Sequence, residues 1–594
     1  MAVLVGVVDA DRERRARFLG DAEARLDTYG DLGRQRWEHG TLTILAAAAA
    51  TTPIHHAGDA DRWTWVIGDV YGADGGDPSR FLEERVDRSG ALETHGQGGY
   101  YLGCTLERSG RVTLGTDILG LFPLYYWSDA EVLLFSTLPG LIHTHPRCPR
   151  RVSAEGLAGI LLQSHMANGQ TLWEGIRRPE GGRAVQWEVG APARTPLANP
   201  LSPSEAHFDL EYDSALDLFD ATLRDAVARS TRRPPDALML SGGMDSRLLA
   251  GHLHALRPGS TRAVVFGDPR DNEVRCARRV ARALNMPVVR LSARFEHYPA
   301  VARAFLQEEH LSNTFHDPAW LTDPEGLRPH HRGMVNGFLG DPIMGGSLVA
   351  PAYDRRRGIY DFEAQFASAN VGGFTPDEIT SLIRALPMAE AVEECTRKMR
   401  DTWDDLPGLP FQKATLWGLY HRGRYHVGPY AWRMARYTWP VMPYVDRAML
   451  ETGLSMPLGH LDQRRMQIDI LKRDYSRLAT LPVDRNLPET PPLIEPWHDL
   501  ARRLLRRARN KLLPERRERR TYYRLFDINN AGWRSLRRLA ATHESSAHRL
   551  FHREVLARYI PSADEEIVCA DAIKDSARLK TLLGLMLLSD RLVE

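Results

Sequence analysis

The stretch ALMLSGGMDSRLLAG, residues 237–251, joins an apolar strand pattern to an amphipathic helix pattern through two glycines. The four apolar residues 237–240 predict a short buried strand, and the residues from Ser246 onward predict a helix. Glycines at the carboxyl end of a parallel strand leave room for converging backbone N–H groups. The helix that follows directs the positive end of its dipole to the same place. The stretch therefore predicts an anion site suited to phosphate.

The polar residues around the two glycines refine this prediction. A Walker A loop requires a lysine, and none is present here. Asp245 can hold Mg²⁺, and the hydroxyls of Ser241 and Ser246 can donate hydrogen bonds to phosphate oxygens. An ordinary glycine-rich turn is the alternative, but the full pattern SGG-x-DS at a strand–helix junction favours the phosphate site.

Strand and helix patterns alternate on both sides of this loop. Strands are predicted at 262–267 and 288–293, and helices at 214–230 and 272–284. This order predicts a parallel α/β sheet whose loops carry the site at the carboxyl ends of the strands. Beyond residue 350 the pattern is mostly helical and rich in arginine.

The first part of the chain has a different pattern. Short β-branched and aromatic runs punctuated by glycine and aspartate predict a β-rich region over residues 1–190. The segment 190–207 is rich in proline and alanine and is the best linker candidate. We therefore expect one domain over 1–195 and a second over 206–594.

Composition limits the function classes. With 594 residues the chain is long enough for two or more domains. Its 77 basic and 76 acidic residues argue against a dedicated nucleic-acid binder. Five scattered cysteines without a CxxC pair indicate reduced thiols and no zinc site. No signal peptide is evident, and the apolar run 42–54 is shorter than the roughly 20 residues of a membrane span. We expect a cytoplasmic protein that does not engage a membrane.

Three segments carry a resemblance to a known family. SGGMDS at 241–246 resembles the motif of the PP-loop ATP pyrophosphatases, which cleave ATP between the α- and β-phosphates and adenylate a carboxylate or amide oxygen. VNGFLGDPIMGG at 335–346 and MPYVDRAMLE at 442–451 resemble loops of the asparagine synthetase branch. The resemblance implies an adenine-nucleotide-α-hydrolase-like synthetase domain, with a parallel sheet and helical additions, that uses ATP and Mg²⁺.

The same resemblance implies roles for individual residues. Asp341 becomes a second Mg²⁺ carboxylate beside Asp245, which we favour over the alternative of a turn residue. Arg485 follows a Leu-Pro as in the family's R-Q-K motif, but Leu487 replaces the motif's lysine; Arg485 is either an electrostatic catalyst near pyrophosphate or a surface arginine. The implied catalytic residues are Asp341 and Arg485. The implied ATP-binding residues are Leu240, Ser241, Gly242, Gly243, Asp245, Ser246, Val265, Phe266 and Gly340.

GTDILGLFPLYYW at 115–127 resembles the glutaminase domain of asparagine synthetases, which implies a degenerate class II, Ntn-type α+β sandwich for the first domain. Ala2 occupies the position of the family's nucleophilic cysteine, Ile67 that of its oxyanion-hole asparagine, and Gln97 that of its substrate-binding aspartate. We therefore expect no glutamine hydrolysis, a scaffold role for this domain, and an amine that belongs to a substrate.

Two relatives of asparagine synthetase lack a working glutaminase. β-Lactam synthetases have Tyr after the first glycine of the second loop, whereas Phe338 stands there in this chain. The loop most resembles that of lasso peptide cyclases, which join a peptide's N-terminal amine to an Asp or Glu side chain. That resemblance implies a leader-cleaved peptide substrate, with a separate leader-recognition protein and leader peptidase.

Other hypotheses remain open. They are a β-lactam synthetase-like enzyme, an asparagine synthetase-like amidotransferase without glutaminase, and a silent ATP-binding scaffold. The basic segment 501–520 could dock an acidic leader, a partner protein or RNA, although a solvated helix face is favoured. His421 and Tyr425 lie one helical turn apart, and a helix surface is favoured over an acyl site.

Overall fold

The computed structural model describes most of the chain. The described residues are 2–30, 32–72, 78, 97–195, 201–313, 315, 321–328, 332–346, 353–354, 359–369, 373–485, 490–495, 521–569 and 574–593. The basic segment 501–520 and Leu487 lie outside these ranges, so the hypotheses about them stay predictions.

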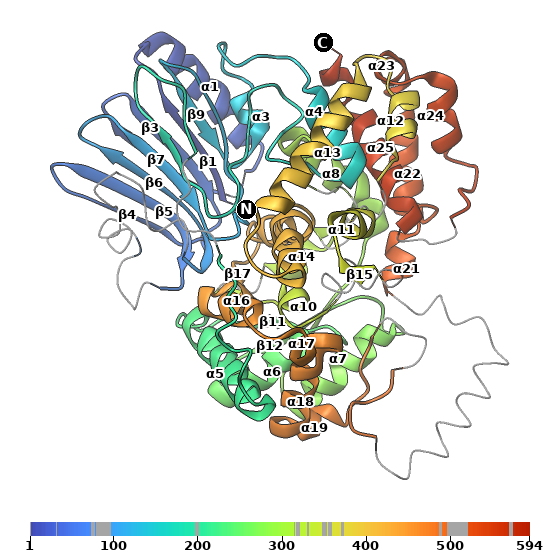
Figure 1. The fold of residues 1–594 in the computed structure, drawn as a ribbon. Helices are drawn as coiled ribbons and strands as arrows, with labels where there is room; N and C mark the ends of the chain where they lie inside the picture. The colour runs from blue at the N-terminus through green and yellow to red at the C-terminus, as the bar shows by residue number, and fades with distance from the viewer. Residues whose placement is uncertain are drawn as a thin grey trace.

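The β-rich front region forms two antiparallel five-stranded sheets (Figure 1). The first sheet contains, in order, β2 (Gly33–His39), β3 (Leu42–Ala48), β1 (Ala2–Val8), β9 (Leu133–Ser136) and β8 (Tyr125–Ser128). The second contains β10 (Val185–Trp187), β7 (Val112–Thr116), β6 (Gly99–Glu107), β5 (Arg62–Val70) and β4 (Ile54–Gly58). His39 of the first sheet stacks near Trp63 of the second, with ring centroids 4.8 Å apart. The two sheets therefore pack face to face, and β1, β3, β6 and β7 are buried along almost their whole length.

Among the described residues of the front region, the following helices accompany these sheets. They are α1 (Arg12–Asp27), α3 (Pro139–Ile142) and α4 (Ala154–Gln163). Asp11 caps α1 by accepting from the amides of Glu13 and Arg14, which defines where that helix begins.

The predicted parallel α/β sheet is confirmed. Its strand order is β13 (Val288–Leu291), β12 (Arg262–Phe266), β11 (Ala237–Met239), β14 (Met334–Val335) and β17 (Pro440–Val441), and every pairing is parallel. The helices α5 (Tyr212–Ser230), α6 (Asp245–Leu256) and α7 (Asn272–Ala283) follow the predicted ranges closely. β11 lies at the centre, so the diglycine loop emerges from the middle of the sheet, where ligands bind in folds of this kind.

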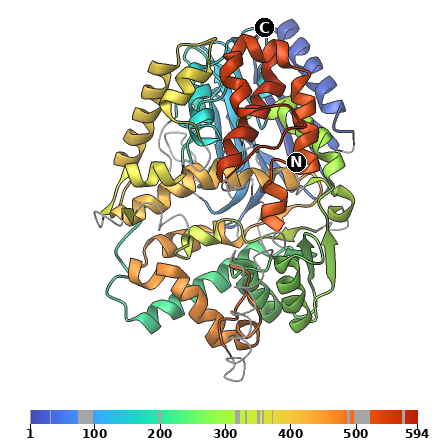
Figure 2. The same ribbon diagram turned by 90° about the vertical axis from the view of Figure 1, so that its right-hand side faces the viewer.

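The rest of the chain is mostly helical, as its pattern predicts (Figure 2). Its helices are α8 (Tyr298–Glu309), α9 (Pro324–Leu327), α10 (Gly340–Ile343), α11 (Phe362–Ala369), α12 (Pro376–Leu382), α13 (Met388–Asp405), α14 (Pro410–Gly418), α15 (Gly428–Met434), α16 (Arg447–Leu454), α17 (Leu458–Leu461), α18 (Arg465–Asp474), α19 (Ser476–Ala479), α21 (Thr521–Phe526), α22 (Ala531–Ala541), α23 (Glu544–Leu550), α24 (Arg553–Tyr559) and α25 (Lys574–Leu592). Short 3₁₀ turns occupy η1 (Phe295–His297), η5 (Pro443–Val445) and η6 (Asp462–Arg464), a π-helix occupies η4 (Leu419–Val427), and β15 (Tyr353–Asp354) pairs with β16 (Ile359–Tyr360).

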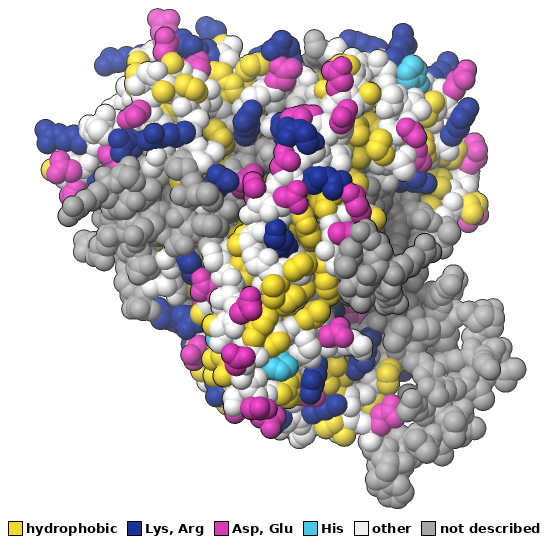
Figure 3. Space-filling model, in the orientation of Figure 1, with side chains coloured by type: hydrophobic (Ala, Val, Ile, Leu, Met, Phe, Trp, Pro, Cys, Tyr) yellow, Lys and Arg dark blue, Asp and Glu magenta, His cyan; other side chains and the backbone are white. Residues whose placement is uncertain are grey.

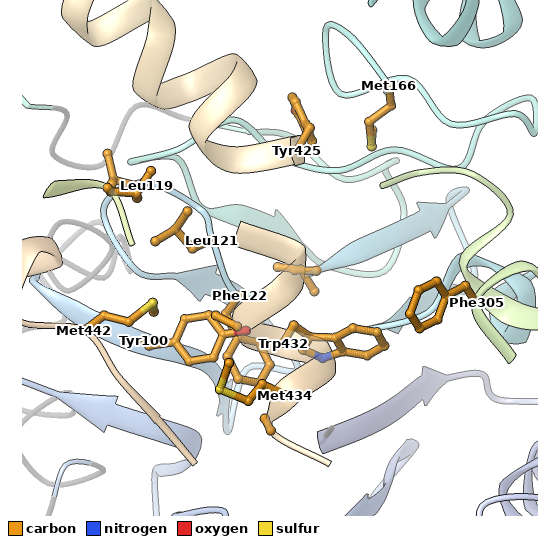
Figure 4. Close-up of a cluster of buried hydrophobic side chains, with 14 of the residues drawn as sticks. Tyr100, Leu119, Leu121, Phe122, Met166, Phe305, Tyr425, Trp432, Met434 and Met442 are labelled. Carbon is orange, nitrogen blue, oxygen red and sulfur yellow. The ribbon is translucent and has the colours of Figure 1, made fainter. Parts of the chain in front are cut away.

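Apolar side chains from both parts of the chain form one core where the front region meets the helices (Figure 4). The front region contributes Tyr100, Leu119, Leu121, Phe122 and Met166, and the later part contributes Phe305, Tyr425, Trp432, Met434 and Met442. All are buried, so separating the two parts would expose a large apolar area to water.

Charged side chains of both signs are interspersed on the face shown in Figure 3. This pattern agrees with the net charge of +1. Among the helices that the structure describes, none combines the length and the apolar character needed to cross a membrane.

Candidate active site

The diglycine loop between β11 and α6 is held by its own serines. The Ser241 amide donates to Ser246 Oγ over 3.0 Å, the two hydroxyl oxygens lie 3.0 Å apart, and the Gly243 amide donates to Ser241 Oγ over 3.2 Å. No side chain caps the start of α6. Its first amides and its dipole are therefore available to an anion. The serines shape the bend, a role additional to the predicted phosphate contacts.

Gly242 is required by close packing behind the bend. A Cβ at this position would lie 2.8 Å from Asp484 Cβ and 3.0 Å from Glu273 Cα. The Asp484 amide donates to the Gly242 carbonyl over 2.9 Å. The segment around Asp484 thus lies directly against the diglycine loop.

Arg247 fastens that segment to α6. Its Nη1 donates to the carbonyls of Leu478 and Leu481 over 2.9 and 3.0 Å, and its Nη2 donates to the Pro482 carbonyl over 2.5 Å. The side chain is fully buried, and burial lowers the pKa of Arg247 to about 10, so it stays charged at neutral pH. Only its position directly after SGGMDS marks this residue in the sequence.

The second loop reaches the first through Tyr444. A Cβ on Gly340 would lie 2.7 Å from the Tyr444 ring, so the ring packs against bare backbone. The Tyr444 hydroxyl donates to the backbone carbonyl of Asp245 over 3.2 Å. Leu339, just before α10, adopts a left-handed conformation with φ 66°. These contacts bring the loop that carries Asp341 to the start of α6.

One guanidinium contacts both predicted metal ligands. Arg464 Nη1 lies 3.8 Å from Asp245 Oδ2, and Arg464 Nη2 forms an ion pair with Asp341 Oδ1. Gln467 Nε2 donates to the other carboxylate oxygen of Asp245 over 2.8 Å. The two carboxylates therefore face one point, and that point holds a cation.

The backbone that presents this guanidinium is strained. Gln463 and Arg464 are consecutive left-handed residues, with φ 54° and 62°. Each costs about 1–2 kcal/mol relative to right-handed backbone for a residue with a Cβ. Such strain persists where the surrounding structure imposes it, commonly at functional sites. No sequence signal distinguishes these two residues from an ordinary surface turn.

A pocket of about 620 Å³ opens beside the diglycine loop. Its walls are Met239, Ser241, Gly243, Met244, Asp245, Ser246, Glu273, Gly337, Phe338, Gly345, Gly346, Asp462, Gln463, Arg464, Ile468, Asp484 and Arg485. Five of the predicted site residues, Ser241, Gly243, Asp245, Ser246 and Arg485, are therefore brought together. The volume lies within the range typical of small-molecule sites.

The remaining predicted residues lie around this pocket without lining it. Leu240, Val265 and Phe266 are buried at the ends of β11 and β12, and Gly242 packs against Asp484. Gly340 lies under Tyr444, and Asp341 meets the pocket through its ion pair with Arg464. Their roles stay predictions.

Two acidic side chains, Glu273 and Asp484, line the pocket next to the diglycine loop. Burial, with the nearby charges of Asp484 and Asp271, raises the pKa of Glu273 to about 8. Glu273 is therefore largely neutral at pH 7, which lessens its repulsion of a phosphate.

The segment 419–428 differs from its expected form. It is a π-helix, and His421 and Tyr425 are both buried, so the favoured interpretation as a helix surface is wrong. His421 stacks on Trp417 with ring centroids 4.1 Å apart, and burial lowers the pKa of His421 to about 3. Leu339 packs against Gly423, so this π-helix supports the second loop.

The front region contacts the sheet that carries the site. Ala2 and Ile67 are buried within β1 and β5. The Trp439 indole donates to Asp69 Oδ2 over 2.6 Å, and the Met442 amide donates to the Tyr71 hydroxyl over 3.0 Å. Asp69 and Tyr71 thus hold the chain on both sides of β17.

Comparisons with known proteins bear on the later part of the chain. The asparagine synthase family matches residues 218–588, more than half of the chain. No curated protein matches the chain.

Two similar solved structures are amidotransferase and purine-biosynthesis enzymes. One is a glutamine phosphoribosylpyrophosphate amidotransferase from B. subtilis complexed with ADP and GMP, at 10% identity and a TM-score of 0.22. The other is an allosteric regulatory enzyme of purine biosynthesis, at 11% identity and a TM-score of 0.23. Each match covers 48% of this chain, and 65% and 64% of the two solved chains. Similarity this low supports no inference about fold or function.

Proposed function

Because the chain belongs to the asparagine synthase family, whose members are ATP-dependent amide-forming ligases, we propose that it closes a macrolactam ring in a lasso peptide. The substrate is a leader-cleaved peptide with an Asp or Glu side chain. The side-chain carboxylate is adenylated with release of pyrophosphate. The peptide's own N-terminal amine then displaces AMP.

The observation that carries the proposal is that the Arg464 guanidinium contacts both Asp245 and Asp341 beside the diglycine loop. Their carboxylate oxygens are the ligands that Mg²⁺ prefers, and they already flank one positive group. The donor set therefore fits a magnesium ion held by these two residues together with the phosphates of ATP. Bound there, Mg²⁺ would supply charge neutralisation on the departing pyrophosphate.

The chain's own residues supply the rest of the phosphate site. The uncapped first amides of α6 and the dipole of that helix bind the phosphate oxygens. Arg464 and Arg485 line the same pocket and stabilise the negative charge that develops on pyrophosphate. In this proposal Arg485 is an electrostatic catalyst near pyrophosphate, and Arg464 supplies the positive charge of the family's missing lysine.

Amide formation then requires a neutral amine and an oriented carboxylate. The substrate carboxylate attacks the α-phosphorus, and the α-phosphorus–oxygen bond to pyrophosphate breaks. The amine attacks the acyl carbon, AMP leaves, and the ammonium loses its proton to solvent. A peptide α-amine has a reference pKa of about 7.7–8.0, so a fraction is neutral near pH 7. Phe338 in the pocket wall cannot accept that proton.

Two features support an amine that belongs to the substrate and a pocket that differs from that of β-lactam synthetases. Ala2 leaves the front region without the nucleophile that releases ammonia from glutamine. Phe338 replaces the tyrosine of β-lactam synthetases and makes an apolar pocket wall together with Met239 and Ile468. Holding a prefolded peptide with its amine near the adenylate can lower the activation free energy by roughly 7–11 kcal/mol.

Incubation of the protein with ATP, Mg²⁺ and a leader-cleaved lasso precursor tests the proposal. A second assay starts from the uncleaved precursor and adds the expected leader-recognition protein and leader peptidase. Formation of AMP and pyrophosphate, with loss of one water from the peptide, is the expected result, and Asp245→Ala should abolish it.

Other outcomes would reject the proposal in favour of a named alternative. Formation of ADP would reject adenylation. Turnover of a carboxyethyl amino acid would favour a β-lactam synthetase-like enzyme. Turnover of aspartate with free ammonia would favour an amidotransferase. Binding of ATP without pyrophosphate release under all these conditions would favour the silent scaffold.

A further inference from the structure

A second pocket, of about 610 Å³, lies where the front region meets the last helix. Its walls come from α1, from the end of α3 with the segment that follows, from the turn after α8, and from α25 near the C-terminus (Figure 1). It shares no lining residue with the pocket beside the diglycine loop. We call it the arginine pocket, after Arg25, Arg150 and Arg591 in its walls.

The arginine pocket is strongly positive. Its three guanidiniums come from three separate segments, and Asp21 is the one acidic residue among its lining residues. Within the described part of the chain, no carboxylate forms an ion pair with Arg150 or Arg591. Arg591 Nη1 instead donates to the Gln307 carbonyl over 2.6 Å and lies 2.9 Å from His310 Nε2. Three arginines and one aspartate give the lining a net charge of +2 with its histidines neutral.

Two histidines in the walls are held neutral. The Trp173 indole donates to His310 Nδ1 over 2.7 Å, so this nitrogen is an acceptor, and His310 Nε2 lies 3.1 Å from the Gln307 carbonyl. His143 stacks on Trp173 with ring centroids 3.9 Å apart. Burial lowers the pKa of His143 to about 4 and that of His310 well below its usual range.

The charges around these imidazoles act in the same direction. The guanidiniums of Arg150, Arg25 and Arg591 all lower the pKa of His143, and those of Arg591 and Arg25 lower that of His310. The arginine charges therefore create a positive electrostatic potential at both imidazoles, and the same potential would attract an anion into the pocket.

The backbone at His310 is strained in the same way as at the candidate active site. His310 and Leu311 are consecutive left-handed residues, with φ 46° and 57°. Among the described residues, the only other consecutive non-glycine pair of this kind is Gln463 and Arg464. Each of the two pockets thus has one doubled left-handed turn in or beside its wall. Strain of this kind is retained where a specific side-chain placement is needed.

We propose that the arginine pocket is a second ligand site, which binds a small phosphate-bearing anion. A phosphate group offers three oxygens to several donors, whereas a carboxylate is satisfied by one bidentate guanidinium. Convergence of three guanidiniums therefore favours phosphate over carboxylate. The volume exceeds one phosphate group, so the ligand carries either more than one phosphate or an organic part. This inference does not rest on the proposed reaction.

Because the pocket is walled by both parts of the chain, its ligand ties the front region to α25. Binding to the folded protein alone raises its stability by mass action. The anion is therefore expected to raise the melting temperature as well as to bind.

Calorimetric titration with tripolyphosphate, at fixed ionic strength in a phosphate-free buffer, tests the inference. Arg150→Gln should weaken binding by about tenfold or more, because hydrogen bonds between charged groups are the strong ones. Arg150 is exposed and makes no ion pair within the described part, so this variant should fold normally. Arg591→Gln should weaken binding similarly.

Matched controls separate this site from other effects. Arg151 is the next residue, is 76% exposed and pairs with Glu174 over 2.7 Å, so Arg151→Gln should bind as the wild type does. Gly242→Ala, which is expected to abolish nucleotide binding at the diglycine loop, should retain this binding, and such retention excludes that loop as the site. Equal weakening by Arg150→Gln and Arg151→Gln would overturn the inference, since it would indicate non-specific attraction. Binding of citrate in preference to tripolyphosphate would overturn the choice of phosphate.

Discussion

Replacing Arg464 by glutamine removes a guanidinium that contacts both Asp245 and Asp341. If these carboxylates are the magnesium ligands, the guanidinium competes with the metal for them. The three side chains are 27%, 25% and 24% exposed, so each contact is partly screened. Two such ion pairs together contribute about 1–2 kcal/mol. Arg464→Gln should therefore strengthen metal binding by about 5- to 30-fold.

Titration with Mn²⁺ as the probe measures this directly, since free and bound Mn²⁺ differ in their electron paramagnetic resonance. The assay needs neither ATP nor the peptide, so it is independent of the substrate assignment. Arg465→Gln is the matched control, because it removes the same charge from the adjacent residue. The Arg465 guanidinium lies 3.8 Å from the centre of the Tyr212 ring. This variant should change Mn²⁺ affinity by less than about twofold.

The same variant separates metal binding from catalysis. If Arg464 also stabilises pyrophosphate, Arg464→Gln should lower kcat for pyrophosphate release while requiring less Mg²⁺. Two results would refute the idea that the two aspartates form a metal site for which this guanidinium competes. One is equal Mn²⁺ affinity in the wild type and Arg464→Gln; the other is an equal increase in Mn²⁺ affinity in both arginine variants.

Three further changes probe the loops. Arg247→Ala should lower the free energy of unfolding by about 3 kcal/mol or more in a denaturant titration, because it leaves the carbonyls of the 478–482 segment without donors. An unchanged unfolding midpoint would show that Arg247 does not hold this segment against α6. Gly242→Ala should abolish ATP binding in calorimetry, because its Cβ meets backbone as well as side-chain atoms, and retained affinity would show that the segment at Asp484 moves freely. ATP affinity should fall as pH rises through about 8, where Glu273 becomes charged, and Glu273→Gln should flatten this profile. Since the pKa of Glu273 is raised from 4.5, the wild type should also lose stability relative to Glu273→Gln as pH rises from 4.5 to about 8.

The elements around the site follow from local sequence patterns. Apolar runs of four to six residues predict β11, β12 and β13, and the amphipathic segments between them predict α6 and α7, all of which the structure contains. The π-helix at 419–427 could not be predicted in this way. It is buried against residues distant in the sequence, such as Leu339, whereas the local pattern favours a helix surface.

The sequence alone determined that a strand ends in a diglycine bend with Asp245 behind it, and that Ala2 cannot act as a nucleophile. These are statements about backbone freedom and side-chain chemistry, which need only the local residues. Only the tertiary structure decided that Arg464 stands between Asp245 and Asp341, and that Arg247 clamps the segment before Asp484. Contacts between residues a hundred or more positions apart depend on how whole elements pack, and no local pattern encodes that.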